Sequence, residues 1–271
     1  MLATGVRRNK SKEYKNRNDM KKILMLMVAA VVLVGCGLRG KYLATKGEKE
    51  HTDSVVVSSD YGRYRMVVDV PAGDNEALQH AVLEFVTEIS GGTYTGNLLD
   101  VQAMLHHYVD TIAREYDAEG KENPFVAEGE MLMESSVEIR KDFENDSLVT
   151  YIYKMYDFQG GPHGTSVLSG QTFRKRDGQR VTWDAFHDVS HPAMAQLLHD
   201  GLMDYFEAAN DEELQDCLLS DDVSSLPLPG TPPLFTADGI LFVYEPYEIA
   251  PYSAGMPQFT VPYEKMKELE R

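Results

Sequence analysis

The sequence predicts an α+β protein with antiparallel sheets, helices packed on one face, and two small subdomains. One observation is that segments rich in β-branched and aromatic residues are joined by short turn clusters, which is typical of hairpins. A second is that segments with apolar residues at helical spacing are grouped together rather than alternating with single strands. That segregation favours α+β over α/β.

The strands and helices follow in order from these signals. The expected strands are residues 55–57, 64–70, 131–143, 148–158, 166–174, 179–182, 234–235, 240–244 and 258–261. The expected helices are residues 75–89, residues 98–116, one that starts after Ser190 with Pro192 in its first turn, and residues 263–270. Asp177-Gly178 predicts a tight hairpin turn. The helix over 98–116 is expected to end before Gly120, because glycine is a common helix stop.

An export signal precedes these elements. Lys21 and Lys22 stand before residues 23–34, which carry no charge, and residues 33–36 read Leu-Val-Gly-Cys. The apolar run is shorter than the roughly 20 residues that a membrane-spanning helix needs. A basic segment, a short apolar segment and a small-residue site make a secretory signal, and the terminal Cys36 resembles a lipobox cysteine. An ordinary signal peptide that contains a cysteine is the alternative.

This interpretation predicts an exported, membrane-anchored lipoprotein of the periplasm or outer membrane, lipidated at Cys36. The translation start is left open between Met1 and Met20. The expected organisation is residues 1–35 as upstream residues plus signal peptide, 36–52 as a flexible tether, and 53–150 and 151–271 as two α+β subdomains. The tether is expected because residues 37–52 are polar and rich in Lys and Gly.

The charge of the chain excludes some partners. The full sequence has a formal charge of −17, and residues 36–271 hold 18 of the 26 basic and 41 of the 43 acidic residues, which leaves −23. Such a body repels nucleic acid, since phosphate contacts need Lys and Arg. It attracts basic partners, although the same charge also serves plain solubility.

Standard enzyme signatures are missing from the sequence. There is no Gly-x-Ser-x-Gly, His-Glu-x-x-His, Cys-x-x-Cys or phosphate-binding glycine loop. His187, His191 and His199 are poorly spaced for a shared metal because Pro192 starts a helix between them. Cys217 lies among apolar neighbours and is expected to be a buried small hydrophobe. We therefore predict no catalytic residues, no metal and no cofactor.

Two loops stand out as candidate binding elements. Residues 160–164 read Gly-Gly-Pro-His-Gly, and residues 246–257 contain three prolines and two tyrosines. Glycines permit close backbone approach, and prolines with tyrosines give a rigid amphipathic surface that loses little entropy on binding. The candidate ligand-binding residues are Gly161, His163, Tyr247, Glu248, Pro251 and Tyr252. A purely structural role, with the tyrosines packed on the sheet and Glu248 bonded to backbone, is the alternative.

These residues resemble the DUF3298 family, the C-terminal domain of RsiV-like proteins. The similarity rests on residues 160–164, 172–173, 177–186, 247–255 and 261–263, and it spans about 155–270. The segment 54–150 is similar in position to the DUF4163 domain that usually precedes it. The resemblance implies a non-enzymatic extracytoplasmic module that binds a protein or cell-wall ligand, with lysozyme as a basic protein partner. Pro162 stands where alanine is common in the family.

The leading functional prediction is a lipid-anchored envelope protein that recognises lysozyme or a peptidoglycan fragment through the two loops. One alternative is a cell-wall hydrolase in which His163, Glu248 and Asp157 supply acid and base groups. The other is a purely structural envelope lipoprotein.

Overall fold

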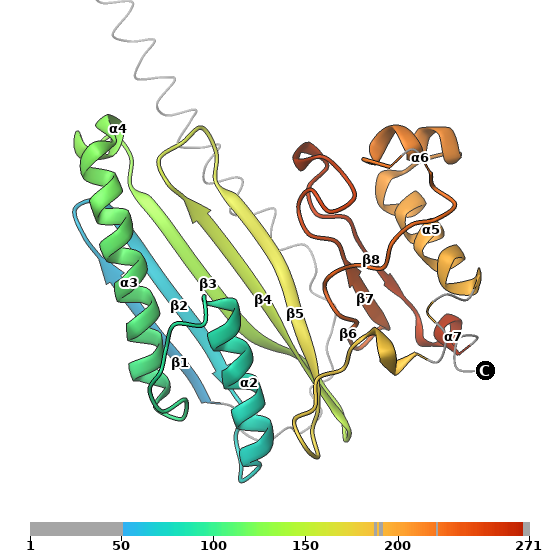
Figure 1. Ribbon diagram of the computed structural model, residues 1–271, viewed down its shortest axis with the longest axis horizontal. Helices are drawn as coiled ribbons and strands as arrows, with labels where there is room; N and C mark the ends of the chain where they lie inside the picture. Colours follow the sequence, from blue (N-terminus) through green and yellow to red (C-terminus); the bar gives the residue numbers. More distant parts are fainter. Residues whose placement is uncertain (1–50, 187–188, 190–191, 221, 268–271) are drawn as a thin grey trace, which may run out of the picture. The chain divides into compact units, whose positions relative to one another are not determined.

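The computed structural model describes residues 51–186, 189, 192–220 and 222–267, and these residues belong to one compact unit. Its described part contains a five-stranded sheet and a three-stranded sheet, with helices against each (Figure 1). The predicted α+β class is confirmed. None of the helices among these residues is both long enough and apolar enough to cross a membrane.

The five-stranded sheet has the order β1-β2-β3-β4-β5. Its strands are β1 His51–Ser58, β2 Gly62–Val70, β3 Met133–Glu144, β4 Leu148–Phe158 and β5 Thr165–Arg174. Three neighbouring pairs are antiparallel, as expected, whereas β2 and β3 are parallel. The parallel pair arises because the chain leaves the sheet after β2, passes through the helical layer and begins β3 at the same end of the sheet where β2 begins.

Helices α2 (Glu76–Ile89) and α3 (Val101–Glu122) cover one face of this sheet (Figure 1). The side chains of Asn75 and Asp100 cap them by accepting hydrogen bonds from the first-turn amides of Leu78 and Ala103. The predicted end before Gly120 is wrong. A Cβ at Gly120 would lie 3.0–3.3 Å from side chains of neighbouring elements, so glycine permits close packing inside the helix.

The main core lies between this sheet and these helices. Strand residues at alternate positions point into it, among them Tyr64, Met66 and Val68 of β2 and Tyr151 and Tyr153 of β4. The short helix α4 (Pro124–Ala127), which the sequence did not signal, follows α3 directly.

The far end of the sheet differs from the expected hairpin. Residues 179–182 do not form a strand; Phe173 and Arg180 make one isolated bridge. The side-chain amide of Gln171 donates to the carbonyl of Val181, and the backbone amide of Val181 donates to the carbonyl of Thr172. Individual hydrogen bonds, rather than a regular strand ladder, therefore hold this segment against β5.

The three-stranded sheet consists of β6 Leu234–Phe235, β7 Ile240–Val243 and β8 Gln258–Val261, all antiparallel. Helices α5 (Pro192–Phe206), α6 (Asp211–Cys217) and α7 (Tyr263–Met266) accompany it. The sequence predicted these strands and α5 but not α6. Cys217 ends α6 and is half-buried, less than expected.

The two sheets share a small apolar cluster and a buried polar contact. Ile152 of β4 packs with Leu234 and Val243, and the Thr172 hydroxyl donates to the carbonyl of Pro233. Residue 150, where the sequence placed the boundary between two subdomains, lies inside β4. Similarly, His51 and Thr52 belong to β1 rather than to a tether.

Candidate functional site

The two loops predicted to bind a ligand meet in the structure. The ring of His163, from the β4–β5 loop, stacks on Tyr252 with centroids 5.3 Å apart and planes at 25°. Tyr252 stacks in turn on Tyr247 at 5.7 Å and 26°. We call these three side chains the ring stack. The Tyr252 hydroxyl also donates to the carbonyl of Gly164 at 2.9 Å, which joins the loops by a directional bond.

Tyr247 occupies an uncommon position. It is 65 % exposed, and its backbone φ is 67°, in the left-handed region that a tyrosine adopts at a cost. An exposed aromatic ring held on a strained backbone is more typical of a functional surface than of a packing requirement.

The segment 246–257 is anchored at several points. The Tyr205 hydroxyl of α5 donates to the carbonyl of Ala254 at 2.8 Å, and the Leu168 amide of β5 donates to the Met256 sulfur at 3.2 Å. Within the segment itself, Ile249 and Ala250 are buried. The loop is therefore fixed in shape before any ligand arrives.

Glu248 has a structural role in this loop. One carboxylate oxygen accepts from the Gly230 amide and the other from the Glu245 amide, both at 2.7 Å. This matches the structural alternative foreseen for Glu248 and leaves neither oxygen without a donor.

Gly161 and Pro251 are both exposed at the rims of their loops. Gly161 and Pro162 border a shallow hollow whose other wall is α4, with Phe125 and Met131. Phe125 is 56 % exposed. We call Phe125, Met131 and Pro162 the apolar shelf. The shelf and the ring stack share the β4–β5 loop, so apolar and aromatic groups continue from α4 to segment 246–257.

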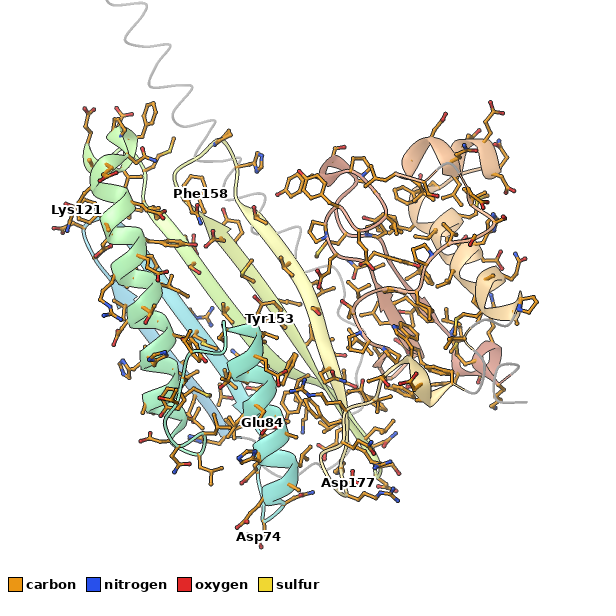
Figure 2. The ribbon with its side chains drawn as sticks, viewed as in Figure 1. Asp74, Glu84, Lys121, Tyr153, Phe158 and Asp177 are labelled. Carbon is orange, nitrogen blue, oxygen red and sulfur yellow. The ribbon has the colours of Figure 1, made fainter. Side chains whose placement is uncertain are left out.

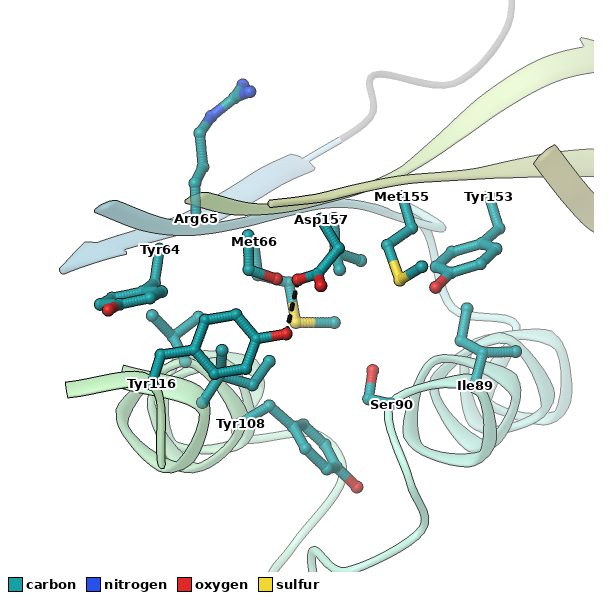
Figure 3. Close-up of a pocket in the computed structure, with 14 residues that line it drawn as sticks. Tyr64, Arg65, Met66, Ile89, Ser90, Tyr108, Tyr116, Tyr153, Met155 and Asp157 are labelled. Carbon is teal, nitrogen blue, oxygen red and sulfur yellow. Dashed lines mark hydrogen bonds between the residues drawn. The ribbon is translucent and has the colours of Figure 1, made fainter. Parts of the chain in front are cut away.

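Asp157 lies apart from these loops, on the helix-covered face of the sheet (Figure 3). Its Oδ1 accepts from the Tyr116 hydroxyl of α3 at 2.6 Å and its Oδ2 from the Gln159 side chain at 3.0 Å. Burial first, and then the bond to Asp157, raise the pKa of Tyr116.

The structure does not gather the acid and base groups of the hydrolase alternative into one site. Neighbouring residues of a strand point to opposite faces, so Tyr156 points away from the side on which Asp157 lies. Gly164 packs against the ring of Tyr156, which puts the loop of His163 on that other side. The sheet therefore separates Asp157 from His163.

Cys36, His187 and His191 lie outside the described residues. His199 contacts Asp211 at 3.1 Å through Nε2. Within the part of the chain that is described, no three His, Cys, Asp or Glu side chains are grouped to hold a metal ion.

Sequence reasoning missed the pocket beside Asp157. Tyr108 and Tyr116 are eight residues apart on α3. Every second position of β4 from residue 153 to residue 157 lines the same pocket, with Tyr153, Met155 and Asp157. These spacings put the residues on one helix face and one strand face. Such patterns equally suit an ordinary core, so spacing alone does not distinguish these residues from core residues.

The C-terminal part of this arrangement has relatives. Residues 229–264 match the DUF3298 family. That family is described as a protein of unknown function, and the matched DUF3298 segment contains Tyr247, Glu248, Pro251 and Tyr252 but not the β4–β5 loop. No curated protein matches the sequence.

Solved DUF3298 structures extend the likeness to the wider fold. A member of the family from Bacteroides fragilis is 18 % identical, with a TM-score of 0.57, and the match covers 83 % of this chain and 95 % of that chain. A DUF3298 family protein from Pseudomonas aeruginosa is 15 % identical, with a TM-score of 0.54 and the same coverages. At these identities the likeness concerns the fold alone.

Proposed function

We propose that this chain is a lipid-anchored, extracytoplasmic binding protein of the cell envelope and that its ligand contacts the ring stack. The first candidate ligands are lysozyme, as a strongly basic protein, and a peptidoglycan fragment. The observation that carries the proposal is the stack itself, in which His163, Tyr252 and the 65 % exposed Tyr247 join two loops far apart in sequence.

Pre-organisation supports a binding role. Ordering a mobile loop costs free energy on association, and the anchored segment 246–257 has little left to lose. Tyrosine is enriched among residues that dominate binding free energy, and the adjoining apolar shelf enlarges the contact area. Ring stack and shelf together offer a central aromatic group with an apolar border.

The charge and the family likeness favour the same class of partner. The formal charge of −23 over residues 36–271 would steer a basic protein toward the surface. The proposal includes an RsiV-like arrangement, with a DUF4163-like region before the DUF3298 segment, and lipidation at Cys36. A cell-wall hydrolase is less well supported, because both oxygens of Glu248 accept backbone amides and Asp157 lies across the sheet from His163.

The test measures binding of the full chain to c-type lysozyme, and separately to soluble muropeptides, by interferometry at two salt concentrations. Tyr252→Ala should weaken binding by about 2 kcal/mol, roughly 30-fold, if Tyr252 is an anchor. Leu99→Ala is the matched control. Leu99 is 55 % exposed, and it precedes α3, whereas the apolar shelf lies beyond the other end of that helix.

Two outcomes would contradict the proposal. Binding that disappears at moderate salt and ignores Tyr252→Ala would mean only that acid attracts base. Absence of binding to both ligands would remove lysozyme and muropeptides as candidates.

A further inference from the structure

A pocket of about 300 Å³ lies between the five-stranded sheet and helices α2 and α3 (Figure 3). It exists because α2 ends at Ile89, whereas β4 continues past Tyr153 to Phe158. Among the described residues, α3 is the one helix that covers the part of the sheet beyond the end of α2 (Figure 1). Most of the wall is apolar, formed by Met66, Ile89, Val109, Ile112, Val137 and Met155.

Asp157 is the one charged side chain that points into this pocket among its lining residues (Figure 3). Arg65 contributes to the lining, but its side chain points away from the helices and pairs with Glu138. The hydrogen-bond partners of Asp157 are the neutral Tyr116 and Gln159. The carboxylate therefore has no cationic partner among the described residues, which leaves a negative potential in a largely apolar site.

Aromatic rings line the same pocket as this carboxylate. Tyr64 and Tyr116 meet edge to face with centroids 5.7 Å apart, and Tyr108 and Tyr153 line the same pocket. The faces of such rings attract cations, and aromatic cages are used to recognise ammonium groups.

The hydroxyl of Tyr153 is a second polar group in this pocket. The residue is 9 % exposed, and its hydroxyl makes no hydrogen bond within the described part of the chain. Burial raises the pKa of Tyr153 to about 12, so the group is a neutral donor and acceptor at working pH. The hydroxyl is accessible from the pocket rather than sealed from solvent, so a ligand there could form a hydrogen bond with it.

We infer that this pocket binds a small organic ammonium ion with an apolar body. The ammonium group contacts Asp157 and the surrounding tyrosine rings, and the apolar body lies among Met66, Ile112 and Met155. A pocket of about 300 Å³ is at the lower end of the range for small-molecule sites, which suits a ligand of the size of phenethylammonium. This inference does not depend on the function proposed for the ring stack.

Calorimetry on the full chain tests the inference with two probes of equal shape. Phenethylammonium carries the charge, and 2-phenylethanol replaces the ammonium with a hydroxyl. We expect the cation to bind at least tenfold more tightly than the alcohol. Asp157→Asn should abolish that preference while the Asn carbonyl still accepts from Tyr116. Asp146→Asn is the matched control, because Asp146 lies exposed in the β3–β4 turn and should leave both affinities unchanged.

Tyr153→Phe provides a second variant that removes no existing bond and should therefore fold. It should weaken phenethylammonium binding by about three- to tenfold, the worth of one hydrogen bond. Equal affinities for the two probes, no binding of either, or an Asp157→Asn variant that keeps the preference would overturn the inference. Tyr252→Ala should leave phenethylammonium binding intact, so failure here is distinguishable from failure of the ring-stack proposal.

Discussion

The ring of His163 lies on the ring of Tyr252, and the Tyr252 hydroxyl reaches the carbonyl of the next residue, Gly164. One tyrosine thus holds the β4–β5 loop by two kinds of contact. The stacked rings set the distance between the two loops, and the hydrogen bond sets how the loops are oriented relative to each other. This relationship couples the five-stranded sheet to the segment that follows the β7 strand.

Tyr252→Phe separates these two contacts. It keeps the ring and removes the bond to Gly164, so the free energy of unfolding should fall by about 1 kcal/mol. Urea titration measures the change. His163→Ala is the complementary variant, since it removes the stacked ring and keeps the hydrogen bond. A Phe variant as stable as the original protein would show that the hydroxyl contributes nothing net.

At Tyr247 we expect stability and binding to oppose each other, because the ring contributes to binding while the side chain strains the backbone. Its φ of 67° strains a residue that carries a Cβ, so Tyr247→Gly should be about 1 kcal/mol more stable than Tyr247→Ala, although both lose the ring. Both variants should bind the lysozyme or muropeptide ligand equally weakly. Thermal unfolding and interferometry on the pair check this. Equal stability of the two variants would contradict the assigned strain.

Glu248→Gln tests the structural role of this carboxylate. A glutamine has one acceptor oxygen for two amide donors, Gly230 and Glu245, so one donor would face an NH₂ group. We expect a loss of about 1 kcal/mol in the free energy of unfolding. Glu245→Gln is the matched control and should stay within about 0.5 kcal/mol, because the exposed Glu245 side chain makes no hydrogen bond in the described part.

The sequence predicted elements whose signals are local. The helix over 75–89 was found to within one residue because Asn75 is a cap and the apolar spacing is regular. The turn cluster at residues 144–146 likewise predicted the β3–β4 hairpin. The prediction that a helix ends before Gly120 is wrong, because this glycine lies inside α3 where α4 and β3 pack closely against it. Residue spacing along the sequence does not reveal such contacts between distant elements.

The candidate site shows the same division. The composition of residues 160–164 and 246–257 singled out both loops, but only the fold shows that His163 meets Tyr252. The pocket at Asp157 escaped notice because it depends on the unequal lengths of α2 and α3 and on which face of β4 that residue occupies.

Glu144 predicts part of the acid sensitivity of the fold. Burial alone would raise the pKa of Glu144, but hydrogen bonds from Lys141 and Lys175 outweigh it and lower the pKa. A folded-state pKa below the unfolded one gives stability that is present above about pH 4.3 and lost as pH falls through the folded value. Urea titrations between pH 3 and 7 should show a shallower acid loss for Glu144→Gln than for the exposed control Glu130→Gln. Parallel curves for the two variants would count against this account.

Gly178 and Gly92 separate backbone strain from steric space. Their φ values are 70° and 68°, yet a Cβ at Gly178 would lie 2.5 Å from the Ala77 carbonyl of α2, whereas one at Gly92 would meet nothing within 4 Å. Figure 2 shows Asp177, the neighbour of Gly178, at the same end of the sheet as Asp74, which precedes α2. Gly92→Ala should cost about 1 kcal/mol of unfolding free energy through strain alone, and Gly178→Ala about 2–4 kcal/mol, because α2 must also move. Urea unfolding of both variants measures the difference. Equal losses would mean that α2 shifts freely and that the turn after β5 does not fix its position.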